Sequence, residues 1–128
     1  MKLEHVALNV VDPAGMAKWW SDNLDMQIVR AVEDPPYFHF IADAQRESML
    51  ELYNNTSVEI PEYATMDPFV FHIAFKVDEI ESVRDKLANA GATIVGDITT
   101  MPTGDQLQFL RDPWNVPFQL VKRVKPLL

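Results

Sequence analysis

The feature that most constrains this chain is an internal repeat. Residues 5–10 read HVALNV and residues 72–77 read HIAFKV, so a histidine, a β-branched residue, an alanine and a large apolar residue recur in order. A second pair of segments, MLELY and PFQLV, places Glu51 and Gln119 at equivalent points. A repeat of this period indicates a duplicated supersecondary unit. Each half therefore offers one histidine and one oxygen-bearing side chain to a shared centre.

Each half is predicted to be β-α-β-β-β. In the first half, Asp12-Pro13 ends a strand and starts a helix, with aspartate as N-cap and proline at the first helical position. In the second half, Asp78 and Glu81 have the spacing of a capping box, and Gly91 is suited to end the helix. Apolar runs and alternation predict strands over 3–11, 27–32, 37–42, 48–53, 69–77, 92–95, 106–111 and 116–123.

The length of 128 residues predicts a single domain with one shared core. Residues 54–68 contain prolines and small polar residues without a clean period, which is typical of a connecting segment. We therefore predict a first module over 1–54, a linker over 55–68 and a second module over 69–123.

Composition excludes several classes of partner and site. A formal charge of −8 argues against nucleic acid and against anionic membrane surfaces. Without cysteine, any metal must be held by imidazole, carboxylate or amide groups. No segment has the length of a membrane span and the N-terminus lacks a signal-peptide pattern, so a soluble, cytoplasmic protein is expected.

Two longer segments carry a family resemblance. WWSDNLDMQIV at 19–29 is similar to a helix-to-strand turn, with Asp25 where glycine is usual, and RDPWNVPFQLV at 111–121 is similar to a terminal turn and last strand, with Asn115 where glycine is usual. With the repeat, the chain resembles the vicinal oxygen chelate superfamily, which includes glyoxalase I, bleomycin-resistance proteins and extradiol dioxygenases. The resemblance implies an α+β fold of two βαβββ modules that form a curled, cup-shaped mixed sheet with the helices outside.

The resemblance also implies a metal site. In metal-binding members the ligands come from the first and last strands of each module, which here are the positions of His5, Glu51, His72 and Gln119. Two imidazoles, a carboxylate and an amide oxygen suit a divalent ion such as Zn, Ni, Fe or Mn. The alternative is that these four are ordinary polar residues on a solvated sheet face.

Gln119 departs from the pattern that the resemblance implies, because glutamate is usual there as ligand and, in glyoxalase-type isomerases, as the catalytic base. Glutamine is neutral and takes up no proton. Glu51 is then the one carboxylate of the set. It is a candidate for ligand, for base, or for the anion of a two-histidine, one-carboxylate iron site.

Other residues are candidates for the ligand site. Tyr37 and His39 share a strand face and are predicted to bind substrate, whereas Phe38 and Phe40 on the other face are an equally good lining. The loop over 101–105 is predicted either as a lid or as a plain connection. Three cations, Arg30, Lys76 and Arg111, are interpreted as surface charges.

Two functions fit these observations. The first is a divalent-metal-dependent enzyme of isomerase, lyase, epimerase or dioxygenase type, acting on a small oxygenated metabolite with Glu51 as catalytic residue. The second is a metal-free small-molecule-binding protein similar to bleomycin-resistance proteins. Either would have a small-molecule partner, and because the resemblance implies cups built within one chain or by exchange between chains, a homodimer is expected.

Overall fold

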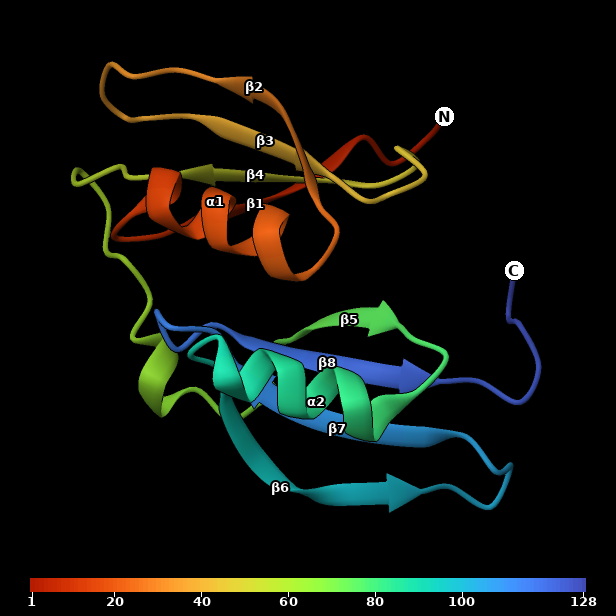
Figure 1. Ribbon diagram of the computed structural model, residues 1–128. Coiled ribbons are helices and arrows are strands. Elements are labelled where there is room, and N and C mark those ends of the chain that lie inside the picture. Colours follow the sequence, from red (N-terminus) through yellow and green to blue (C-terminus); the bar gives the residue numbers. More distant parts are fainter. The chain divides into compact units, whose positions relative to one another are not determined.

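A computed structural model describes all 128 residues, and its elements run through the predicted order twice (Figure 1). The chain divides into two compact units, Met1–Pro61 and Glu62–Leu128. The boundary falls within residues 55–68, where Tyr63–Thr65 forms a short 3-10 helix, η1. The first unit contains β1 His5–Asn9, α1 Pro13–Asn23, β2 Gln27–Ala31, β3 His39–Ala42 and β4 Met49–Tyr53. The second contains β5 Ile73–Lys76, α2 Ile80–Asn89, β6 Thr93–Thr100, β7 Gln106–Arg111 and β8 Pro117–Lys122.

Each unit forms one four-stranded mixed sheet with the same strand order. The first sheet runs β1-β4-β3-β2 and the second runs β5-β8-β7-β6. In both, the first and last strands of the module pair in parallel and the other pairs are antiparallel. The predicted α+β class with two βαβββ modules is confirmed.

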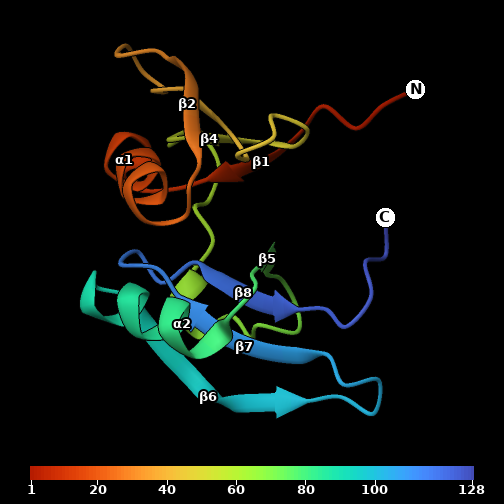
Figure 2. The ribbon, with the colours of Figure 1, turned by 45° about the vertical axis from the view of Figure 1, so that its right-hand side comes forward.

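In each unit the helix packs against one face of its own sheet (Figure 1 and Figure 2). Helix α1 contacts β2, β3 and β4, and buries Met16 and Trp20 completely. Helix α2 contacts β6, β7 and β8, and buries Ile80 and Leu87. Side chains alternate between the faces of a strand, so the other face of each sheet is left to the remaining residues, including the predicted ligands. Neither helix has the length and apolar character needed to cross a bilayer.

The first helix begins as predicted. The side chain of Asp12 accepts a hydrogen bond from the backbone N–H of Gly15 at 3.0 Å, and proline occupies the first helical position. This bond satisfies one of the amide donors that a helix leaves free at its start.

The predicted capping box of the second helix is wrong. Helix α2 begins at Ile80, and its N-cap is Glu79, whose side chain makes no capping hydrogen bond. The extended backbone of Glu79, with φ −136° and ψ 118°, moves the start one residue further along than the box requires. Ser82 rather than Glu81 therefore occupies the third helical position.

Three turn residues singled out by the sequence have left-handed backbone. Gly91 follows α2 with φ +107°, as expected of a helix stop. Asp25 and Asn115, which replace glycine at the two family-like turns, have φ 55° and φ 68°. Aspartate and asparagine tolerate this conformation better than other residues with a Cβ atom.

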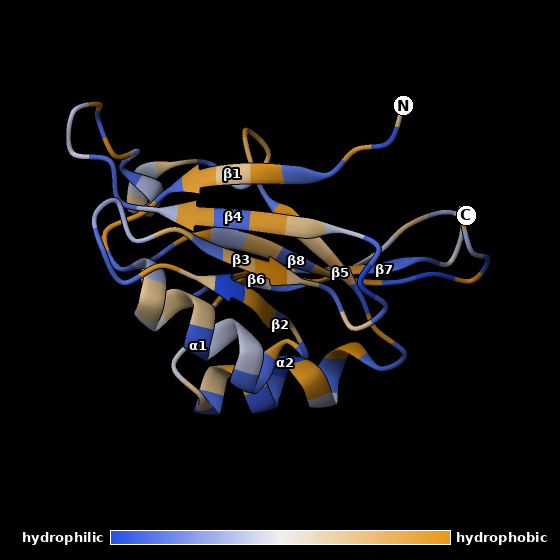
Figure 3. Cartoon of the chain, turned by 90° about the horizontal axis from the view of Figure 1, so that it is seen from above, coloured by the Kyte–Doolittle hydropathy of each residue, from blue (hydrophilic) through white to orange (hydrophobic).

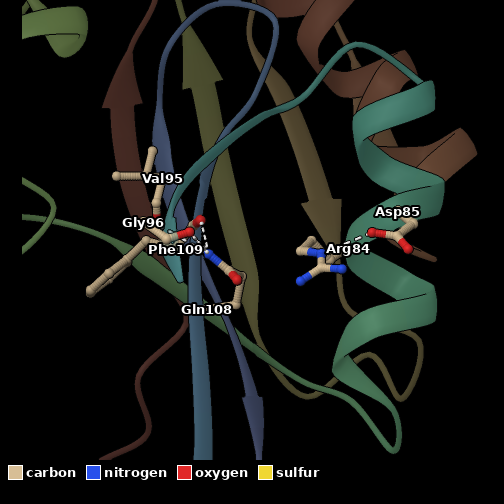
Figure 4. Close-up of polar contacts among 6 residues, drawn as sticks. All are labelled: Arg84, Asp85, Val95, Gly96, Gln108 and Phe109. Carbon is tan, nitrogen blue, oxygen red and sulfur yellow. Dashed lines mark hydrogen bonds and ion pairs between the residues drawn. The ribbon is translucent and has the colours of Figure 1, made fainter. Parts of the chain in front are cut away.

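Strand β6 is longer than the predicted segment at 92–95 and has a register shift between Val95 and Thr99. Gln108 lies against this irregularity, and its Nε2 donates to the carbonyls of Val95 at 3.0 Å and Gly96 at 3.2 Å (Figure 4). Gln108 is completely buried and its Oε1 has no partner. The register shift disrupts the hydrogen-bond ladder of the sheet locally, and the buried side-chain amide of Gln108 supplies hydrogen bonds to these two backbone carbonyls.

Candidate functional site

In the first unit, His5 and Glu51 lie on the sheet face that α1 leaves uncovered. Ala7 is opposite Glu51 in the parallel pairing of β1 with β4, and His5 is two residues before Ala7. The apolar residues of β4 flank Glu51, and Figure 3 shows this strand as hydrophobic bands interrupted by a hydrophilic band. The Nε2 atom of His5 is 3.4 Å from Oε2 of Glu51, and the two side chains are 32% and 16% exposed. The structure therefore brings these two predicted ligands together.

The other ring nitrogen of His5 is also occupied. Its Nδ1 lies 2.7 Å from Oε2 of Glu4. An ionised carboxylate accepts only, so the Nδ1 atom donates to Glu4 and a neutral imidazole then presents the lone pair of Nε2 to Glu51. Two lone pairs at this distance repel each other unless a proton or a cation lies between them.

In the second unit, His72 has the equivalent arrangement. Its Nδ1 donates to the carbonyl oxygen of Pro68 at 2.7 Å, which leaves Nε2 as the acceptor in the neutral ring. Ala74 is opposite Gln119 in the pairing of β5 with β8, as Ala7 is opposite Glu51. Gln119 is buried. His72 and Gln119 thus share one face of the second sheet.

A phenylalanine packs edge-on against each histidine, a feature that the sequence reasoning missed. The ring of Phe40 is 5.8 Å from that of His5, and the ring of Phe109 is 5.1 Å from that of His72, both T-shaped. Phe40 is opposite Glu51 and Phe109 is opposite Gln119 in the antiparallel pairings. The signal was available, because both residues belong to strands of the internal repeat.

His39 lies away from this face, and Tyr37 lies outside the strand. Tyr37 precedes β3 with φ 61°, and His39 is opposite Leu52, on the side that α1 covers. His39 is buried, and its Nδ1 donates to the carbonyl oxygen of Tyr37 at 2.8 Å. The register therefore favours the alternative lining, in which Phe38 and Phe40 share the face of Glu51.

The donors of the first unit fit a divalent ion. Ligand atoms about 2.1 Å from a tetrahedral ion lie about 3.4 Å from one another, and the Nε2–Oε2 distance of His5 and Glu51 is 3.4 Å. The bond from His5 to Glu4 is of the kind that orients a metal-binding imidazole. Within neither unit do three His, Asp or Glu side chains come together at one point.

Comparisons with known proteins agree with this architecture. The chain is 27% identical to a lactoylglutathione lyase from Haemophilus influenzae over 95% of this chain and 93% of that protein. A glyoxalase family protein from Bacillus cereus has a similar structure, with a TM-score of 0.80 at 15% identity, covering 98% of this chain and 95% of its own. An antibiotic binding protein from Streptomyces sp. CB03234 has a TM-score of 0.73 at 10% identity, covering 95% of each chain. Residues 2–120 match the family model of the glyoxalase/bleomycin resistance protein/dioxygenase superfamily, and the protein belongs to this superfamily.

Proposed function

We propose that this protein is a divalent-metal-dependent enzyme of the glyoxalase type, acting on a small oxygenated metabolite by isomerase or lyase chemistry. The observation that carries the proposal is the pairing of His5 with Glu51, at a distance suited to two ligands of one ion. The similarity to a lactoylglutathione lyase supports lyase chemistry over dioxygenase chemistry, which is a less favoured form of the same proposal.

The proposed ligands are His5, Glu51, His72 and Gln119. Support comes from each sheet separately, since both histidines donate through Nδ1 and both oxygen-bearing residues are opposite an alanine. Alanine beside each ligand leaves room that a larger side chain would fill. Imidazole, carboxylate and amide donors suit Zn, Ni, Fe or Mn.

The proposed division of labour follows from the two oxygen-bearing residues. A bound divalent ion supplies Lewis-acid stabilisation of the charge that develops on a substrate oxygen. Glu51 is the group able to take up a proton and is assigned as general base. Gln119 is neutral and orients the substrate or completes the ligand set, but moves no proton.

Metal uptake tests the proposal. Untagged protein should bind close to one equivalent of Zn or Ni, and His5→Ala or His72→Ala should lose most of that metal. His39→Gln is the matched control, because it removes the remaining histidine from the covered side of the first sheet. Turnover of the hemithioacetal of methylglyoxal and glutathione is the second readout. Full metal content in both alanine variants would refute the ligand assignment.

A metal-free binding protein is the second candidate. The neutral Gln119 and the aromatic cluster of Phe38 and Tyr53, whose rings lie 5.9 Å apart, favour it. Wild-type protein that takes up no Zn, Ni, Mn or Fe(II), yet binds an organic ligand, would establish this function instead.

We also propose a homodimer. Chains with two βαβββ modules are able to complete a site within one chain or by exchanging modules. Sedimentation equilibrium that shows only the 14.6 kDa monomer at high concentration would refute the dimer.

A further inference from the structure

A pocket beside Glu51 is lined by a carboxylate, a guanidinium and apolar side chains. Its volume is about 210 Å³, and it is lined by Arg30, Val32, Phe38, Phe40 and Glu51. Phe40 is opposite both Arg30 and Glu51, so these three residues form a row across β2, β3 and β4. A volume of this size holds several waters, which suits a small metabolite.

Arg30 reaches this face because of an irregularity in β2. Ile28 is opposite Ile41, which is on the covered side of the sheet. Regular alternation would place Arg30 on that same side, two residues after Ile28. The register shifts between Ile28 and Arg30, and Arg30 is opposite Phe40 instead. Bulges of this kind re-aim side chains and are frequent next to functional sites.

The guanidinium of Arg30 has no acidic partner within the chain. It takes part in no ion pair and no hydrogen bond, although the protein has 19 acidic residues. Arg84 and Arg123, by contrast, pair with Asp85 at 2.8 Å and Asp105 at 2.9 Å. Arg30 is therefore available to a ligand, and its planar fork matches a carboxylate through two parallel hydrogen bonds.

We propose that Arg30 binds the carboxylate of a small anionic substrate whose reacting oxygens lie at the Glu51 end of the pocket. This rests on the proposed function, because it assigns the substrate class of the same site. Two strand spacings of about 4.8 Å separate the backbones of Arg30 and Glu51 by roughly 10 Å. The arginine side chain takes up part of this separation. A short oxo or hydroxy acid fits in the remaining part, with its carbon atoms in contact with the ring of Phe40.

Charge favours a carboxylate over a phosphate. Glu51 and the net charge of −8 both repel anions. A carboxylate carries a single negative charge at neutral pH, whereas inorganic phosphate carries more, so the repulsion is smaller for the carboxylate. The local attraction of Arg30 is the compensating interaction in this pocket.

Titration of chelator-treated protein with lactate, pyruvate and inorganic phosphate, followed by amide shifts in NMR spectra, tests the assignment without a metal. Arg30→Gln should weaken lactate or pyruvate binding about tenfold or more. Arg30→Lys should recover part of the loss, because it restores the charge and not the fork. Arg46→Gln is the matched control, since it removes another exposed arginine of the first unit that has no ion pair, and should change nothing.

Several outcomes overturn the proposal. Equal affinities of wild type and Arg30→Gln, no binding of either acid by the wild type, or tighter binding of phosphate would each do so. A Zn titration of the same proteins separates the two proposals. If Zn binding is present and unaffected by Arg30→Gln while acid binding does not change, only the anion site fails. If the wild type takes up no Zn but acid binding depends on Arg30, the metal enzyme fails and the anion site stands.

Discussion

The two units carry the same set of positions with different chemistry. On one face of each sheet lie a histidine, a ligand-capable residue on the last strand, a phenylalanine on the third strand and a residue opposite it on the second. In the first unit these are His5, Glu51, Phe40 and Arg30, and in the second they are His72, Gln119, Phe109 and Val95. The repeat keeps the histidine and its aromatic neighbour in both units, and places formal charge in the first alone. On the proposals above, the charged groups that would bind ions belong to the first unit.

Replacing the carboxylate of the first unit with the amide of the second should have the largest effect. Glu51→Gln leaves no anionic ligand in the set, and we expect Zn or Ni affinity to fall on the order of a hundredfold, with loss of any turnover. Glu4→Gln, which keeps an oxygen acceptor for His5 Nδ1 but removes its negative charge, should cost about tenfold. Isothermal titration measures both. Unchanged metal affinity in Glu51→Gln would mean that the carboxylate of the first unit and the amide of the second do not differ in their contribution to metal binding.

The covered faces of the sheets also differ at equivalent positions. Gln108 is opposite Leu120 and holds the β6 irregularity, whereas His39 is opposite Leu52 and makes a single side-chain bond. Gln108→Leu should lower the free energy of unfolding by about 1–2 kcal/mol, a loss reduced by removal of the unpaired Oε1. His39→Leu should cost about half as much. Urea denaturation gives both values, and a larger loss for His39 would contradict the assigned role of Gln108.

Giving the second unit the carboxylate of the first should tighten metal binding. Gln119→Glu adds a charge at the proposed ligand position, and we expect Zn or Ni affinity to rise about tenfold. The gain requires the ionised carboxylate, so it is present at higher pH and is lost as pH falls through the titration of Glu. Titrations from roughly pH 8 to pH 4 measure it. Equal affinities of wild type and variant throughout would remove residue 119 from the ligand set.

The helix starts offer a smaller contrast. Asp12→Ala removes a capping bond and should destabilise the protein by about 1 kcal/mol. Glu79→Ala removes no capping bond and only an exposed ion pair with Lys122, so we expect a change within about 0.5 kcal/mol. Thermal melts of the two variants provide the comparison. Equal losses would show that the cap of α1 contributes nothing beyond side-chain packing.

The smallest predicted effect is confined to acid. Hydrogen bonds from the backbone of Val124 and the side chain of Arg123 lower the pKa of Asp105. A lowered pKa stabilises the folded state above the ordinary pKa of aspartate, and that contribution is lost as pH falls through the folded-state value. Asp105→Asn should therefore weaken the dependence of melting temperature on pH in this acid range. An unaltered pH profile would contradict the contribution of Asp105.

The sequence predicted the elements that depend on local chemistry. The start of α1 follows from Asp12 and Pro13, and the stop of α2 follows from Gly91, because caps act over a few residues. The start of α2 was misjudged, since the extended backbone of Glu79 is not encoded in the Asp78 to Glu81 spacing.

The face that each strand residue occupies was less predictable. Alternation separated His39 from Phe40 correctly, but only the pairing of Phe40 with Glu51 shows which of them belongs to the site face. Arg30 was interpreted as a surface charge and is exposed, but the register shift that places it on the face of Phe40 leaves no local signal in the sequence.

The pairing of the first strand of each module with its last has a consequence for the order of folding. Strand β1 lies at the edge of its sheet and has β4 as its one neighbour, so its ladder is incomplete until Tyr53 has been synthesised. From then on, every strand pairing of the first unit is available within Met1–Pro61. At about 5–20 residues per second, β8 is complete roughly 3–14 s later. Because the module is duplicated, the first and last strands pair in two successive steps during translation, and each step joins residues that are closer in sequence than a single pairing across the whole chain would.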